Sequence, residues 1–77
     1  MNINVSYFGM IQEKIGLTKE TFIVEGELLN FKNWIEDKYP FLKNLPYKIA
    51  VNNEIVQNEV IINQDVNVAL LPPYAGG

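Results

Sequence analysis

ELLNFKNWIEDKYP, residues 27–40, carries the helical pattern on which the prediction of the fold depends. Apolar side chains recur there at intervals of three and four residues, which is the spacing of one helix face. They are Leu28, Phe31, Trp34, Ile35 and Tyr39. Pro40 ends the pattern, because it lacks a backbone donor and pushes the preceding residue out of the helical region. We expect one substantial helix over 27–39 that faces the core, with Lys32 and Glu36 paired on its outer side.

Strand-like segments come before this helix. Residues 2–7 alternate polar and apolar side chains, which is the period of a strand with one wet face. Residues 10–16 read as a short helical turn that stops at Gly16. Residues 18–25 are rich in β-branched and aromatic side chains, which favours a second strand and a hairpin with the first.

Further strands follow the helix. Residues 47–56 read as two strands around Asn52 and Asn53, which tolerate the positive φ of a tight turn. Residues 66–71 alternate again and predict the last strand. This order predicts an α+β roll in which a mixed sheet of about five strands packs against one main helix. It suits the β-grasp architecture, in which the first and last strands lie side by side.

Composition excludes several function classes. A chain of 77 residues is expected to build one domain with a small core. Its net charge of −3 opposes binding to nucleic acid or to an anionic membrane surface. No apolar run reaches the ~20 residues of a membrane span, and the start lacks a signal-peptide pattern, so we expect a cytoplasmic protein.

The side chains give little material for catalysis. The chain has no histidine and no cysteine, so it lacks the usual acid–base group, the strongest protein nucleophile and thiolate ligands for a metal. Its acidic residues stand singly or beside lysines in polar stretches, which indicates solvated surface charge. We expect a protein that is not itself an enzyme and holds no metal.

Three apolar side chains are predicted to face away from the helix. In the last strand Val66, Val68 and Leu70 share the covered face, so Leu71 looks outward. By the same parity Phe8 emerges on the open face, and either Ile55 or Val56 must do so. Single exposed apolar residues are ordinary. Phe8, Leu71 and Ile55 together, however, would form a surface for docking partners.

Residues 72–77, PPYAGG, are predicted to form an extended, flexible tail after a folded domain of residues 1–71. Pro72 and Pro73 end the strand and favour an extended chain that leaves the body. Tyr74 and Ala75 lead to Gly76 and Gly77, which lack Cβ atoms and can pass through a passage as wide as a backbone. Many glycine-rich termini are idle, but this tail carries no charged side chain and ends in a carboxylate.

The ending PPYAGG resembles that of the small, sulfur-carrying subunit of molybdopterin synthase, within the ubiquitin-like sulfur carriers of β-grasp fold. The resemblance covers nearly the whole chain and includes the strand leading into Phe8, residues 12–16, residues 50–52 and the approach to the tail. The proline pair is more telling than the diglycine, because the thiazole-pathway carriers usually lack it. Gln12, where the family commonly has arginine, departs from the pattern, as do Gln64-Asp65 for Asp-Gly and Leu70-Leu71 for a frequent aromatic pair.

The resemblance implies a cycle in which the protein is a co-substrate. An E1-like adenylyltransferase uses ATP and Mg²⁺ to join the Gly77 carboxylate to AMP. A sulfur donor such as a cysteine desulfurase or a rhodanese then displaces AMP and leaves a thiocarboxylate. The tail next enters the large catalytic subunit of molybdopterin synthase, within a heterotetramer, and gives its sulfur to cyclic pyranopterin monophosphate. The family's docking positions match Phe8, Ile55 and Leu71.

Three other functions stay open from the sequence. The same chemistry can serve thiamine thiazole, tungsten cofactor or tRNA thiolation. The chain can also be a ubiquitin-like modifier that is joined to lysines through an isopeptide bond. The third reading is an interaction module whose tail is idle.

Overall fold

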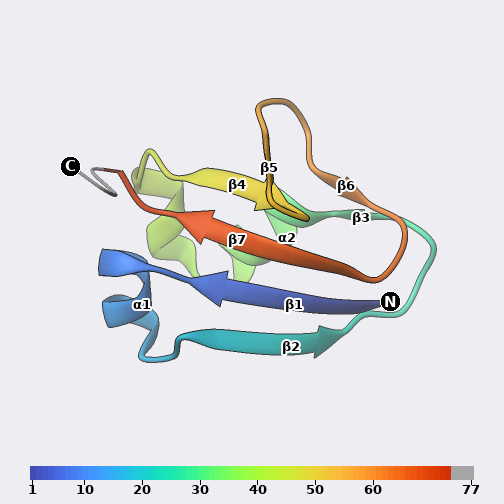
Figure 1. The fold of residues 1–77 in the computed structure, drawn as a ribbon, viewed down its shortest axis with the longest axis horizontal. Coiled ribbons are helices and arrows are strands. Elements are labelled where there is room, and N and C mark those ends of the chain that lie inside the picture. Colours follow the sequence, from blue (N-terminus) through green and yellow to red (C-terminus); the bar gives the residue numbers. More distant parts are fainter. Residues whose placement is uncertain (74–77) are drawn as a thin grey trace.

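A five-stranded sheet covered on one face by a helix makes up the body of the protein (Figure 1). The structure, a computed structural model, describes residues 1–73. The strands lie in the order β2-β1-β7-β4-β5. Their bounds are β1 Asn2–Tyr7, β2 Lys19–Ile23, β4 Lys48–Val51, β5 Glu54–Val56 and β7 Val66–Leu71. Helix α2, Phe31–Lys38, lies behind this sheet in the view of Figure 1.

The first and last strands form the centre of the sheet. β1 and β7 pair in parallel, from Ile3 opposite Val66 to Tyr7 opposite Leu70. β2 pairs antiparallel with β1, and β4 pairs antiparallel with β7. The prediction that the two terminal strands are neighbours is confirmed, and both run toward the same end of the molecule (Figure 1).

The predicted alternation decides which face is covered. Along β1 the apolar positions are buried, and the asparagines between them are exposed. The same alternation holds in β7, where Val66, Val68 and Leu70 are buried. These side chains form one core with Phe31 and Ile35 of α2. Burial of that apolar face stabilises a helix too short to persist alone.

Helix α2 begins four residues later than the sequence predicts. Asn30 is its N-cap, and its side chain accepts a hydrogen bond from the Asn33 backbone N–H at 3.3 Å. Leu29–Asn30 forms strand β3, which pairs with β6, Ile61–Ile62. Leu28 therefore lies outside the helix and is 68% exposed. The predicted start was wrong because this leucine extends the apolar spacing by chance.

Several shorter elements follow the predictions. Helix α1, Gly9–Ile15, ends at Gly16, whose φ of 85° is the left-handed C-cap conformation. Asn52 and Asn53 have φ values of 49° and 72° and turn β4 into β5.

Pro40 starts a 3₁₀ helix, η1 Pro40–Asn44, directly after α2, which the sequence did not predict. Trp34 packs edge-on against Phe22, with ring centroids 4.8 Å apart, as expected of a core side chain.

The strand order, the parallel central pair and the single covering helix are those of the β-grasp fold. No helix within residues 1–73 combines the length and the apolar character needed to cross a membrane.

Candidate docking face and tail exit

The face of the sheet opposite α2 is divided into a polar half and an apolar half. In the polar half Asn4 donates to the Asn67 side chain at 3.1 Å and accepts from the Thr21 hydroxyl at 2.8 Å. Asn52 accepts from the Asn67 backbone N–H at 3.1 Å. These side chains use their hydrogen-bonding groups on one another across three neighbouring strands. The polar half is therefore a closed network that offers few free groups to a ligand.

The apolar half lies where β1 and β7 end. Phe8 follows directly after β1 and is 46% exposed, and Ile55 of β5 is 51% exposed. Leu71 is the last residue of β7 and is half-buried, opposite Lys48 in β4. Ala50, the partner of Ile55, also pairs with a small residue, Ala69, so small side chains lie between Ile55 and β7, and Lys48 stands beside Leu71 on the same face. We call Phe8, Ile55 and Leu71 the docking face.

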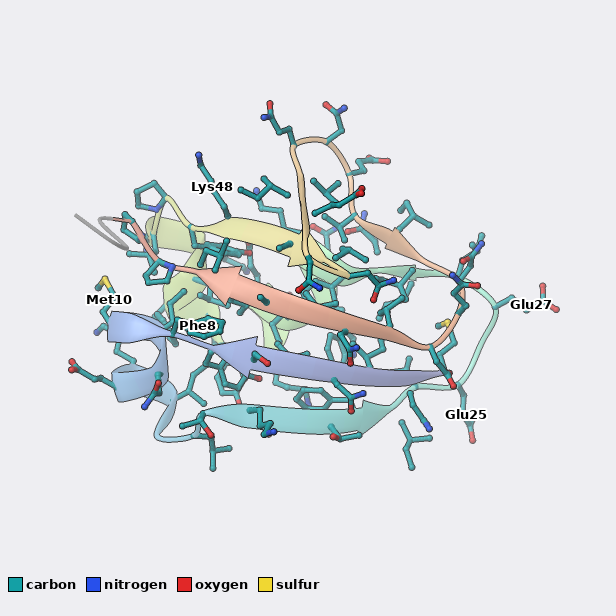
Figure 2. All side chains as sticks on the ribbon, viewed as in Figure 1. Phe8, Met10, Glu25, Glu27 and Lys48 are labelled. Atoms are coloured by element: carbon teal, nitrogen blue, oxygen red, sulfur yellow. The ribbon has the colours of Figure 1, made fainter. Side chains whose placement is uncertain are left out.

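The structure thus places the three predicted docking residues on the open side, although Leu71 is less exposed than expected. Figure 2 shows Phe8 at the end of β1, and Met10 nearby at the same end of the molecule. Met10 was missed by the sequence reasoning and is an exposed large apolar side chain. Since Ile11 is buried and Ile15 is half-buried in α1, the helical period alone assigns Met10 to the outer side.

Pro72 lies against α1 and not in solvent. β7 ends at Leu71 as predicted, but Pro72 is buried. Its ring occupies space that a side chain at Gly9 would fill, because a Cβ atom there would stand 3.0 Å from Cγ of Pro72. Gly9 also has a φ of 51°, which favours glycine. The expectation that the chain leaves the body at Pro72 is therefore wrong. Pro73, the next residue, is still half-buried.

The remaining predicted tail residues, Tyr74, Ala75, Gly76 and Gly77, lie outside the described residues. Their roles and the docking role of Phe8, Ile55 and Leu71 stay predictions. Within residues 1–73, no group of three histidine, cysteine, aspartate or glutamate side chains is placed to hold a metal ion.

Two carboxylates are held by tyrosine hydroxyls. Tyr7 donates to Oε1 of Glu20 at 2.8 Å, and Tyr39 donates to the same oxygen. Burial and this carboxylate raise the pKa of Tyr39 to about 12, and burial raises the pKa of Tyr7 further. Tyr47 donates to Oε2 of Glu36 at 2.6 Å, and burial again raises its pKa. The first group joins β1 and β2 to the residue that follows α2, and the second joins α2 to the residue that precedes β4, which is a structural role.

Three charged side chains can be placed relative to the docking face. Figure 2 shows Lys48 toward the end that carries Phe8 and Met10, whereas Glu25 and Glu27 lie at the opposite end. Lys43 pairs weakly with Asp37, at 4.0 Å between Nζ and Oδ1. The docking face is therefore apolar with a basic neighbour.

Comparison with known proteins agrees with this arrangement. Three solved structures share the fold. A protein described as molybdopterin converting factor, subunit 1, from Pyrococcus furiosus is 18% identical with a TM-score of 0.77, over 95% of this chain and 98% of that one. SAMP1 from Haloferax volcanii is 17% identical with a TM-score of 0.75, over the full length of both chains. Small archaeal modifier protein 1 from Methanosarcina acetivorans is 21% identical with a TM-score of 0.71, over 99% of this chain and 96% of that one.

The family of this chain is established by its sequence. Residues 5–77 match the sequence model of the ThiS family, so the match begins within β1 and runs through the β-grasp body to Gly77. The chain belongs to the ThiS family, as a ubiquitin-like sulfur carrier of the ThiS and MoaD type.

Proposed function

We propose that this chain carries sulfur for molybdenum cofactor synthesis on the carboxylate of Gly77. The observation that carries the proposal is the family match up to Gly77 on a β-grasp body whose last strand ends beside an apolar face. The structural likeness to a protein described as molybdopterin converting factor, subunit 1, favours this pathway among those open to the family.

The proposed chemistry takes place on the chain end and uses the active sites of partners. A carboxylate oxygen of Gly77 attacks the α-phosphorus of Mg²⁺-bound ATP in an E1-like adenylyltransferase, and pyrophosphate leaves. With sulfide as donor, sulfur then attacks the carbonyl carbon and the bond to AMP breaks. The resulting thiocarboxylate is an anionic nucleophile supplied without a cysteine. In the cell a cysteine desulfurase or a rhodanese would provide the sulfur.

The body of the protein has a passive part in this cycle. The docking face presents the chain end to the adenylyltransferase and then to the large catalytic subunit of molybdopterin synthase. In that complex, a heterotetramer in this proposal, sulfur passes to cyclic pyranopterin monophosphate. The protein is a co-substrate in the cytoplasm and not a catalyst.

An intact-mass measurement tests the sulfur chemistry. The protein is incubated with a MoeB-type adenylyltransferase, ATP, Mg²⁺ and sulfide. We expect the mass gain of one oxygen replaced by one sulfur, located at Gly77 by fragmentation. A chain without Gly77 is expected to melt as the full chain does and to gain no sulfur. Retained sulfur transfer by the shortened chain would falsify the role of Gly77.

The pathway is tested by association. We expect binding to the large subunit of molybdopterin synthase and none to a thiazole synthase; the reverse result would assign the chain to thiazole formation.

The likeness to two SAMP1 structures favours a second candidate, a protein modifier joined to lysines. Conjugates that require Gly77, in cells in which no thiocarboxylate forms, would establish that function instead.

A further inference from the structure

A cavity of about 320 Å³ opens beside the docking face, at the β5 edge of the sheet. It is bounded by the first turn of α2, by β4 and by β5 with the segment that follows it. Its apolar lining includes Ile49, Val56 and Val60, and its polar lining includes two amides and two lysines. A volume of this size accommodates one or two side chains of another protein.

The two lysines give the cavity a positive charge. Lys32 comes from α2 and Lys48 from β4, and none of the residues that line the cavity is acidic. Neither ammonium group has a carboxylate within 4.0 Å in the part of the chain that the structure describes. In a chain of net charge −3, the lining of the cavity thus carries only positive charge next to apolar surface, and the exposed Glu59, between the lining residues Asn58 and Val60, is not part of it.

The position of Glu36 explains why Lys32 is available. The sequence predicts a Lys32–Glu36 pair one helical turn apart, and that prediction is wrong. Glu36 instead accepts a hydrogen bond from the Tyr47 hydroxyl at 2.6 Å. Tyr47 lines the cavity too, so its hydroxyl engages the Glu36 carboxylate there, and Glu36 does not pair with Lys32.

The cavity is continuous with the docking face. Ile55 belongs to both, since it lines the cavity and is exposed on the open side of the sheet. Lys48 lies directly opposite Leu71, the last residue of β7. A partner that covers Phe8, Ile55 and Leu71 therefore reaches the mouth of the cavity without a gap.

We propose that this cavity receives an aspartate or glutamate side chain of the protein partner that covers the docking face. The carboxylate lies between Lys32 and Lys48, and the apolar neighbours of the acidic residue contact Ile55 and Val56. The partner therefore carries an acidic residue within an apolar surface. The identity of the partner rests on the proposed function, whereas the chemistry of the cavity does not.

Peptide titration tests the cavity alone. The full chain, labelled with ¹⁵N, is titrated with acetyl-Leu-Glu-Leu-amide and with its neutral analogue, acetyl-Leu-Gln-Leu-amide, at low salt. We expect amide shifts at Ile49, Val56 and Asn58 that are stronger with the acidic peptide and weaken with added salt. Lys32→Gln and Lys48→Gln are each expected to reduce affinity about two- to fivefold, the range of an exposed ion pair.

Lys19→Gln is the matched control, because Lys19 is exposed on β2 at the other edge of the sheet. We expect it to leave the titration unchanged. Equal binding of the two peptides, or an equal loss in the Lys19→Gln protein, would overturn the proposal. Shifts at the same amides that grow with protein concentration, without peptide, would also overturn it and would assign the cavity to a second copy of this chain.

Partner binding completes the test. Lys32→Gln and Lys48→Gln are expected to weaken association with the adenylyltransferase or the large synthase subunit, with unchanged melting temperatures. If the unaltered protein binds neither enzyme, the proposed function fails while the peptide result stands. If it binds them and gains sulfur but the acidic peptide is not preferred, only the cavity proposal fails.

Discussion

Phe8 has two roles at one position. It is the N-cap of α1, with φ −130° and ψ 157°, and its carbonyl accepts hydrogen bonds from the N–H groups of Ile11 and Gln12. Its side chain cannot cap the helix, since it has no acceptor. A polar side chain at this position would stabilise the helix, and the phenylalanine ring does not. A residue that gives up a local stabilisation is expected at a functional surface, so we interpret the exposed ring as a contact for a partner.

The substitution Phe8→Asp separates these roles. Aspartate at an N-cap accepts a hydrogen bond from a backbone N–H of the first turn, which stabilises a helix by about 1 kcal/mol. We expect this gain to offset the contacts that the half-exposed ring loses, so that the free energy of unfolding changes by less than about 1 kcal/mol. Association with the adenylyltransferase, measured by calorimetry, should fall about tenfold or more.

Ile61→Asp is the matched control, because Ile61 is exposed to a similar extent, 49% against 46% for Phe8, and lies in β6 of the separate two-stranded sheet. Unchanged association of the Phe8→Asp protein, or an equal loss in the Ile61→Asp protein, would remove Phe8 from the interface. Leu71→Asp is a less clean test, since Leu71 is half-buried and its replacement is expected to lower stability as well.

At the scale of elements, the β4–β5 hairpin depends on its two asparagines. Asn53 has a φ of 72°, which is costly for a β-branched side chain. We expect Asn53→Val to lower the free energy of unfolding by about 1–2 kcal/mol and Asn53→Gly to maintain it or raise it slightly, in urea denaturation. Asn52 is less suited to this test, because its side chain also accepts from the Asn67 backbone. Equal stability of the two Asn53 variants would contradict the turn geometry.

The elements that sequence predicted well are those with a local cause. The alternation in β1 and β7, Gly16 after α1 and the paired asparagines act within a few residues, so their pattern is visible without the fold. The start of α2 was wrong because it depends on β3 pairing with β6, some thirty residues away in the chain. Two-residue strands show no period. Their pairing is a property of tertiary structure.

The same distinction applies to the site. Parity located Phe8 on the open face, since it needs only the strand register, and it left open whether Ile55 or Val56 faces out; the structure shows that Ile55 does. The burial of Pro72 could not be predicted, because it depends on the absence of a Cβ atom at Gly9, in a different part of the chain. The absence of a Lys32–Glu36 pair beside the cavity goes with the hydrogen bond from Tyr47 to Glu36, which no spacing rule indicates.

Across the whole molecule, tyrosine hydroxyls couple the sheet to the helix layer. The pKa of Tyr39 is raised to about 12 from its ordinary value of 10, and the pKa values of Tyr7 and Tyr47 are raised as well. The folded protein therefore holds these protons more tightly than the unfolded chain. We expect the free energy of unfolding to fall as pH rises from about 10 to about 12 and to show no such loss below about pH 9.

Urea denaturation at successive pH values checks this slope. Tyr39→Phe serves as the comparison, because it removes one of the ionisable hydroxyls and leaves the lysines, which titrate nearby, unchanged. We expect a shallower alkaline slope for Tyr39→Phe. Parallel slopes for the two proteins would show that Tyr39 does not contribute to the alkaline loss.

The contact of Pro72 with α1 limits how deep the active site of any enzyme that acts on Gly77 can be. Counted from that buried ring, five residues remain, Pro73 to Gly77. An extended chain spans about 3.3 Å per residue, so the reacting centre of that enzyme must approach within about 16 Å of Pro72. An enzyme whose active site lies farther than this from its surface could reach Gly77 only after Pro72 leaves its contact with α1. The turnover of that enzyme would then depend on how readily the proline ring leaves α1.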